Sequence, residues 1–308
     1  MQKSTSLSAW IILFGLALTW GSSFILMKQA LHAFSGIQIA SFRLLAAGAF
    51  FVPLLIAQRA HLPNRTQWGW SFVCGMVGSF FPAYLFSYAV MHMDSSLVGI
   101  MNSFTPLFVL LIGYLFFSQR ITRRQLGGLL LGLAGCILIT LSGLQGKLTF
   151  NSYSLLVVLA TILYGLNPFL LRKYLSGLKP LVLTGATFVT IAPLAAIFLF
   201  QTDFADRLQA DGAFWSLAAA VTLGLVGSGI AMIFYNHLLQ MTGPVFVSSV
   251  TYLIPIVAVG WGVLDNEQIQ LQHFVGMAII LVGVYLVNYA PVKKIAAPEM
   301  KVAGDEGI

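Results

Sequence analysis

The stretch CGMVGSFFPAYLFSY, residues 74–88, returns in altered form as LGLVGSGIAMIFYNH, residues 223–237. The two stretches align without a gap at a spacing of 149 residues, and both carry Val-Gly-Ser at the same place. The same spacing pairs Pro106 with Pro255 further along the chain. A constant register of this length indicates an internal duplication, because chance matches between apolar segments would drift.

A second pair of similar stretches lies nearer the start of each copy. TWGSSFILMK (residues 19–28) and LYGLNPFLLRK (residues 163–173) share an aromatic residue, a glycine, a small polar residue and a cation at a spacing of 144 residues. Glycine, serine and Asn-Pro are weak helix formers in an otherwise apolar run. We therefore expect locally loosened helix at residues 21–23 and 165–168, facing the protein interior.

The composition is that of a membrane protein. Of the 308 residues 58% are hydrophobic and only 8% are charged, whereas a soluble domain carries about 25% charged residues. Apolar runs of about 20 residues, each long enough to cross a hydrocarbon core of about 30 Å, recur throughout the chain. The sequence predicts an all-α integral membrane protein with ten spans, at residues 9–28, 36–57, 68–91, 95–117, 125–143, 152–171, 180–200, 213–239, 244–264 and 273–290.

The distribution of Lys and Arg predicts the orientation. With the N-terminus in the cytoplasm, cytoplasmic segments hold 12 of the 16 cations and the opposite face holds 3, while Arg43 lies within a span. We therefore expect both termini in the cytoplasm and a multi-pass location in the plasma (bacterial inner) membrane. The first span ends in Lys28 without an A-x-A cleavage pattern, so we interpret it as retained. The net charge of +7 reflects topology and anionic lipid headgroups, so no nucleic-acid partner is expected.

Two repeats of five spans each follow from the duplication. An odd number of crossings makes the second repeat enter the membrane from the opposite face, so the repeats are inverted around a central cavity, as in many transporters. The predicted order is a cytoplasmic tail (1–8), a first repeat (9–143), a connecting loop (144–151), a second repeat (152–290) and a cytoplasmic tail (291–308).

Several of these motifs resemble the drug/metabolite transporter superfamily, specifically its EamA-type ten-helix metabolite exporters. The likeness is carried by TWGSSFILMK, by FRLLAAG (residues 42–48), by residues 102–135 with their proline, basic loop and glycines, and by residues 252–283, which repeat that pattern. It covers residues 8–290. Ser118, where such exporters commonly carry Glu, and Ser23, where Asn is more usual, depart from the pattern. The resemblance implies export of amino acids or related solutes.

Polar and aromatic side chains inside the spans predict a substrate cavity. Aromatic rings and amides around a small-molecule site are typical, although each could instead make an interhelical hydrogen bond. The candidates are Trp20, Ser23, Tyr84, Tyr88, Asn102, Thr105, Tyr164, Asn167, Tyr235, Asn236, Thr251 and Tyr252.

Arg43 is the one ionisable residue well inside a predicted span. A cation at the centre of a membrane helix costs about 2.5–3.5 kcal/mol on insertion scales, so a role is expected. It either contacts the carboxylate of a solute or clamps helix-end carbonyls. Pro106, Pro168 and Pro255 are expected to kink their helices, as static bends or as gating hinges.

The remaining patterns narrow the function. Cys74 and Cys136 have no ligand partners at metal spacing, no cofactor motif is present, and HExxH, GxSxG and Walker A patterns are absent, which argues against an intramembrane enzyme or an ATPase. We expect a secondary transporter of small metabolites acting as a monomer, by uniport or exchange. The alternative is a translocator of lipids or lipid-linked head groups on the same scaffold.

Overall fold

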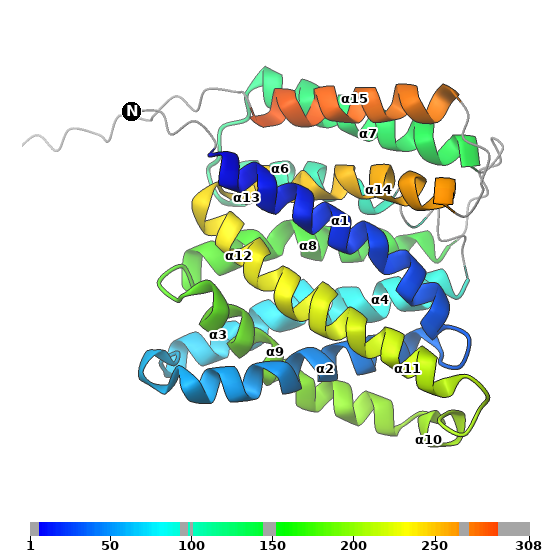
Figure 1. The fold of residues 1–308 in the computed structure, drawn as a ribbon. Coiled ribbons are helices and arrows are strands. Elements are labelled where there is room, and N and C mark those ends of the chain that lie inside the picture. Colours follow the sequence, from blue (N-terminus) through cyan, green and yellow to red (C-terminus); the bar gives the residue numbers. More distant parts are fainter. Residues whose placement is uncertain (1–5, 93–97, 99–100, 144–151, 265–270, 289–308) are drawn as a thin grey trace, which may run out of the picture.

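The protein is a bundle of helices in the computed structural model, which describes residues 6–92, 98, 101–143, 152–264 and 271–288 (Figure 1). The first part of the chain forms α1 (Leu7–Ala30), α2 (Gly36–Ala57), the 3₁₀ helix η1 (Arg59–His61), α3 (Arg65–Gly75), the π-helix η2 (Met76–Phe80), α4 (Phe81–Val90), α6 (Thr105–Phe116) and α7 (Arg123–Gly143). The second part forms α8 (Ser154–Tyr174), α9 (Pro180–Phe200), α10 (Phe204–Arg207), α11 (Ala213–Thr222), the π-helix η3 (Leu223–Ile230), α12 (Ala231–Met241), α13 (Pro244–Ser248), α14 (Val250–Leu264) and α15 (Leu271–Asn288).

The expectation of an all-helical membrane protein is confirmed for the described residues, which contain helices but no strand. Among the described residues, six segments are long and apolar enough to cross a membrane: Leu7–Met27, Gly36–Ala57, Arg65–Val90, Ser154–Tyr174, Pro180–Phe200 and Ala213–Met241. Three shorter apolar helices cover Thr105–Phe116, Pro244–Val257 and Phe274–Val287. Helix occurs in each of the ten predicted stretches, and the count of ten crossings stays a prediction.

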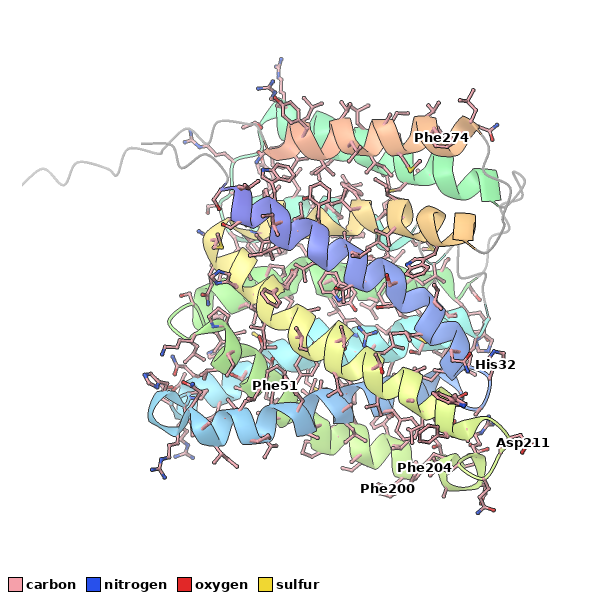
Figure 2. The ribbon with its side chains drawn as sticks, in the orientation of Figure 1. His32, Phe51, Phe200, Phe204, Asp211 and Phe274 are labelled. Atoms are coloured by element: carbon pink, nitrogen blue, oxygen red, sulfur yellow. The ribbon has the colours of Figure 1, made fainter. Side chains whose placement is uncertain are left out.

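Large apolar side chains cover the outside of the bundle as well as its interior. Phe274 on α15 is 58% exposed and Phe200 at the end of α9 is 74% exposed, whereas Phe51 on α2 is fully buried (Figure 2). Exposed aromatic and aliphatic side chains in this number would be unfavourable in water. They suit a surface that faces lipid.

Polar caps set where several helices begin. At the start of α2, the Ser35 hydroxyl accepts from the Gln38 backbone N–H at 3.4 Å, and the Gln38 side chain accepts from the Ser35 N–H at 2.8 Å. Asn64 and Gln67 make the same reciprocal pair at the start of α3. Each pair satisfies two backbone donors that the first helical turn leaves free. Pro180 begins α9, where its missing N–H costs nothing.

The same Gln38 side chain also ties the start of α2 to the end of α9. Its amide donates to a carboxylate oxygen of Asp203 at 2.8 Å, and Arg207 Nε donates to the other oxygen at 2.9 Å. The hydrogen bond from Arg207 is the main cause that lowers the pKa of Asp203 below its ordinary value. The carboxylate form is therefore favoured at this connection between the two parts of the chain.

Both π-helices fall on the repeated Val-Gly-Ser motif. Residues 77–79 lie in η2 and residues 226–228 lie in η3. Each π-helix continues an α-helix on either side, so α3, η2 and α4 form one rod, and α11, η3 and α12 form another. Single π-turns inside α-helices occur often at functional sites. The repeated motif therefore has the same backbone irregularity, a π-helix, in both parts of the chain.

The expected loosening at residues 21–23 and 165–168 is wrong. α1 and α8 run through these positions as continuous α-helix. In α1 the hydroxyls of Ser22 and Ser23 donate back to the carbonyls one turn earlier, at 2.7 Å and 3.0 Å. A glycine in a helix costs only about 1 kcal/mol, and in lipid a broken helix would leave backbone groups unsatisfied.

The prolines divide into two kinds. Pro168 and Pro255 lie inside α8 and α14, as expected for bends. Pro106 instead lies in the first turn of α6, because the described chain is in a turn at residues 103–104 and the helix begins at Thr105. Pro106 therefore follows an interruption in the helical run of its predicted span, where a proline in a first turn breaks no hydrogen bond. Its action as a bend or a hinge stays a prediction.

Two helix pairs bring the parts of the chain together along their lengths, α2 with α9 and α7 with α15. In the first pair Gly48 faces Ala192, and a Cβ built on Gly48 would lie 2.5 Å from the Ala192 Cβ. In the second pair Gly128 lies against the Gly283 backbone, where a Cβ would come within 2.7 Å of its carbonyl oxygen. Small residues allow this approach, which is how helices associate in lipid.

Candidate functional site

The π-helix η3 is the meeting point of three side chains from the first part of the chain. Trp20 Nε1 donates to the Gly227 carbonyl at 2.8 Å, and Arg43 Nε donates to the Ser228 hydroxyl at 2.5 Å. The Ser23 hydroxyl lies 3.5 Å from where a Gly227 Cβ would be. Helices α1 and α2 are therefore both joined to η3 by polar contacts.

The π-helix η2 meets α8 in a comparable way. The side-chain amide of Asn167 lies directly on Gly78, where any Cβ would collide with it. Asn167 is 5% exposed, and its Oδ1 has no hydrogen-bond partner among the described residues. An unpaired buried acceptor costs about 1–3 kcal/mol. Since no described residue donates to this oxygen, it can accept a hydrogen bond from a bound molecule.

Aromatic rings lie beside both π-helices. The ring of Trp20 lies 5.8 Å from that of Tyr235 on α12, and the ring of Tyr164 lies 5.6 Å from that of Phe86 on α4. All four side chains are partly accessible. Two aromatic pairs, each formed between the two parts of the chain, therefore line the region that η2 and η3 share with α1 and α8.

Arg43 on α2 places a positive charge beside η3. Tyr164 lies near this charge, one helical turn before Asn167 on the same face of α8. Within the described part of the chain, no hydrogen bond reaches the terminal Nη atoms of Arg43, and the one ion pair is between Arg207 and Asp203. The guanidinium is permanently charged, so this region holds a cation that can accept an anionic group. We call the region bounded by Trp20, Ser23, Arg43, Gly78, Tyr164, Asn167, Gly227, Ser228 and Tyr235 the central seam.

Several other predicted site residues make local hydrogen bonds. Tyr84 shares a hydrogen bond of 2.6 Å with Ser41 and packs against Phe80 and Phe198. Thr105 Oγ1 donates to the Asn102 carbonyl at 2.8 Å, and Thr251 Oγ1 donates to the Ser248 carbonyl at 3.0 Å. These bonds satisfy the hydroxyl donors within one or two helical turns or between neighbouring helices.

Two predicted site residues lie apart from the central seam. Tyr252 is fully buried, packs on Gly132 and donates its hydroxyl to the Leu129 carbonyl at 3.0 Å. It therefore fills the contact between α14 and α7. Tyr88 is 40% exposed and lies with its ring 4.8 Å from that of His92. It belongs to a surface cluster at the end of α4.

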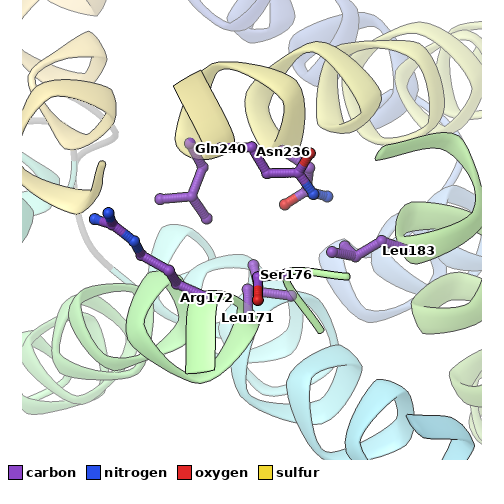
Figure 3. Close-up of a pocket in the computed structure, with 7 residues that line it drawn as sticks. Leu171, Arg172, Ser176, Leu183, Asn236 and Gln240 are labelled. Atoms are coloured by element: carbon purple, nitrogen blue, oxygen red, sulfur yellow. The ribbon is translucent and has the colours of Figure 1, made fainter. Parts of the chain in front are cut away.

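Asn236 lines a separate pocket of about 140 Å³ (Figure 3). Its side-chain amide donates to Thr184 Oγ1 at 2.9 Å, while its Oδ1 has no partner among the described residues. The other lining residues come from the end of α8 and from α9 and α12: Leu171, Arg172, Ser176, Leu183, Leu239 and Gln240. Arg172, the cation of the second repeated stretch, thus stands at the edge of a cavity. The side chain of its counterpart Lys28 is outside the described residues.

The sequence offered a signal for the residues it missed. Gly78, Gly227, Ser228 and Phe86 are not among the residues predicted for the substrate cavity. All four lie in the duplicated stretch, and three of them belong to the repeated Val-Gly-Ser motif itself. A repeat of glycine followed by serine, preserved through a duplication inside one chain, marks where side chains from other helices approach the backbone.

Comparison with known proteins agrees with this architecture. Residues 7–141 and 151–289 each match the EamA-like transporter family. The uncharacterized inner membrane transporter YedA of Escherichia coli K12 is 24% identical over 307 residues, covering 96% of each chain. An uncharacterized transporter of Synechocystis is 27% identical, covering 93% of this chain and 92% of its own.

Two further matches are more distant. A probable amino-acid metabolite efflux pump of Salmonella typhimurium is 21% identical, covering 87% of this chain and 90% of its own. A solved crystal structure superposes with a TM-score of 0.73 at 17% identity, covering 91% of this chain and 96% of that one. With both parts of the chain matched, the protein is a multi-pass membrane transporter rather than an enzyme, and it belongs to the EamA-like transporter family of the drug/metabolite transporter superfamily.

Proposed function

We propose that the protein exports small metabolites, such as amino acids or related amphipathic solutes, by alternating access between two inverted five-helix repeats. The repeats are residues 9–143 and 152–290, and the solute binds in the central seam between them. The connecting loop at 144–151 and the tail at 291–308 lie outside the described residues. The observation that carries the proposal is the seam itself, which gathers a guanidinium with no acidic partner among the described residues, an amide oxygen with no donor among them, and two aromatic pairs.

Contacts that recur with their partners exchanged support the two-repeat arrangement. Gly75 lies against the Thr187 carbonyl, and Gly224 lies against the Arg43 carbonyl. Gly224 follows Gly75 by 149 residues, and Thr187 follows Arg43 by 144 residues. One contact is thus the other with the two parts of the chain swapped. Such an exchange is what a two-fold axis between equivalent units produces.

Other contacts repeat in the same way. Gly21 lies against Val257, and its equivalent Gly165 lies against Phe108, the equivalent of Val257. The Trp20–Tyr235 ring pair likewise corresponds to the Tyr164–Phe86 pair. At the level of whole helices, α1 packs on α14 and α12 while α8 packs on α6 and α4. In each matched pair of contacts, one residue is related to its equivalent by 144 positions and the other by 149.

Chain direction supports an inverted rather than a parallel pair. α1 and α8 run in opposite directions along the bundle, as do α2 and α9 (Figure 1). α1 begins and α15 ends at the same end of the bundle (Figure 1). With the excess of Lys and Arg on that side, we place both termini in the cytoplasm. An inverted pair can exchange the conformations of its two repeats and so open the seam to either face.

The chemistry of the seam favours amphipathic solutes that carry a carboxylate. Arg43 can pair with a negative charge, the Asn167 oxygen can accept from an ammonium or amide group, and the aromatic rings can cover an apolar side chain. The seam offers these three features within one region between the repeats. An amino acid presents all three complementary groups in one small molecule.

The test is transport by purified protein in liposomes. Liposomes are loaded in turn with each proteinogenic amino acid, and efflux is followed with and without a pH gradient. We expect efflux of a subset of amphipathic amino acids, and Arg43→Gln should reduce that efflux by about tenfold or more, because a hydrogen bond to a charged group contributes about 1.5–3 kcal/mol. Efflux no faster than from protein-free liposomes for every amino acid would reject the proposal.

A further inference from the structure

Arg43 has no cationic counterpart at the equivalent position of the second repeat, so its positive charge lies on the η3 side of the central seam. The equivalent position, 144 residues later, is Thr187, whose hydroxyl donates to the Thr184 carbonyl at 2.7 Å within its own helix. Ser228, which accepts from Arg43, corresponds to Ser79 in η2. The serine is therefore duplicated while the cation is present once.

We infer that Ser228 is a positioning residue, which fixes the Arg43 guanidinium as a single anion pole on the η3 side of the seam and so selects solutes by a negative charge. This inference rests on the transport function proposed above. It goes further by stating which end of the solute faces which repeat. The carboxylate lies toward η3, and the hydrogen-bond donor of the solute lies toward Asn167 and η2.

The geometry of the guanidinium supports this division of roles. Nε is the inner nitrogen of the fork and is occupied by Ser228 Oγ at 2.5 Å. The two Nη atoms, which together present a flat edge to a carboxylate, have no partner among the described residues. A hydroxyl on Nε restricts rotation about the last side-chain bonds without using the edge that binds an anion.

The position of Ser228 in the backbone supports it as well. Ser228 is 4% exposed and follows Gly227, whose carbonyl accepts from Trp20. The π-turn thus holds two neighbouring residues that bind α1 and α2 of the other repeat. A guanidinium fixed through this turn keeps its place relative to Trp20 and Tyr235. Arg43 in a membrane interior costs energy, and an anionic solute would offset that cost.

The experiment compares acids with their uncharged analogues. Binding to purified protein is measured by the shift in thermal unfolding midpoint with each proteinogenic amino acid and with its carboxamide, which lacks the negative charge. KM and kcat for efflux of the amino acid that binds best are then measured in liposomes. Four proteins are compared: wild type, Ser228→Ala, Ser228→Thr and Ser79→Ala.

We expect wild type to bind the acid at least about tenfold more tightly than the amide. Ser228→Ala should raise KM for the acid by roughly three- to tenfold, with kcat and amide binding unchanged, because a mispositioned cation still carries its charge. Ser228→Thr retains a hydroxyl and should restore the wild-type KM. Ser79→Ala is the matched control, since the position equivalent to Arg43 in that half is Thr187, and it should leave KM unchanged.

The outcomes separate the two proposals. Transport with equal binding of acid and amide would overturn the anion pole and leave the transport function in place. An equal rise in KM for Ser79→Ala, or an unchanged KM for Ser228→Ala, would overturn the positioning role. Absence of both binding and efflux for every amino acid would reject the proposed function and this inference together. Size-exclusion profiles matching wild type exclude misfolding as the cause of any change.

Discussion

The two π-helices share the Val-Gly-Ser motif and meet helices of the opposite repeat, yet they differ in their contacts. Gly78 in η2 is pressed against Asn167 with no room for a side chain, whereas Gly227 in η3 leaves 3.5 Å to the Ser23 hydroxyl. A cation, Arg43, is hydrogen-bonded to η3, whereas the equivalent position beside η2 is Thr187. Duplication has kept the backbone irregularity and varied the groups around it. Under the proposed mechanism, a shared backbone would allow both halves to undergo the same motion, while different side chains would give the bound solute one orientation.

The largest effect is expected at Gly78, and it is measured against the same substitution at its equivalent, Gly227. Gly78→Ala would drive its Cβ into the Asn167 amide, so transport should fall by roughly 10- to 100-fold, as for a functional group displaced by about 1 Å. Gly227→Ala meets only an ordinary contact with Ser23 and should stay within about twofold of wild type. Both are measured as liposome efflux per folded protein.

Equal loss in the two variants would show that the π-turns tolerate no side chain for backbone reasons alone. We call the Gly78–Asn167 contact the tight side of the seam and the Gly227–Ser23 contact the open side. The proposed difference between these two sides would then be wrong. Comparable expression and equal elution volumes of the two variants are the control for folding.

A second experiment separates function from stability on the tight side. Asn167→Leu removes a buried acceptor that has no partner among the described residues, which otherwise costs about 1–3 kcal/mol, while keeping a similar volume. Thermal stability should be unchanged or higher than wild type, and efflux should fall by about tenfold. Ser23→Ala, the equivalent change on the open side, removes a hydroxyl satisfied within its own helix at 3.0 Å. Its effect on efflux should be smaller.

The smallest effect is expected outside the seam, at Tyr252. Tyr252→Phe removes the hydroxyl that donates to the Leu129 carbonyl and should lower the free energy of unfolding by about 0.5–1.5 kcal/mol. Efflux per folded protein should not change, because this side chain fills the contact between α14 and α7. A change in KM with unaltered stability would return Tyr252 to the solute site and extend the seam beyond its present boundary.

The helical class and the positions of most helices could be predicted because lipid restricts a chain to few options. Long apolar runs must be helical to satisfy their backbone groups, so the limits of α2, Gly36–Ala57, agree with the prediction from the sequence. The caps at Ser35 and Asn64 are equally local signals. The two spacings of the duplication, 144 and 149 residues, also identify which residues of the two repeats are equivalent.

The direction in which each side chain faces could be predicted less well than the positions of the helices. In a helix that is apolar all round, periodicity does not distinguish the lipid face from the protein face. Tyr252 and Tyr235 therefore looked alike in sequence, although one packs on α7 and the other pairs with Trp20. The sequence does not predict the π-helices, because no particular amino-acid composition distinguishes a π-turn from an α-turn. It predicts an irregular helix at residues 21–23 instead, where α1 is continuous.

One contact in the middle of the bundle bears on how such a protein came about. Gly48 and Ala192 are equivalent residues that touch each other, so under the proposed symmetry each meets its own counterpart. In a precursor built from two separate identical chains, a methyl group at this place would have clashed with its twin. Two copies within one chain can differ at this place, and here only the second copy carries the methyl group.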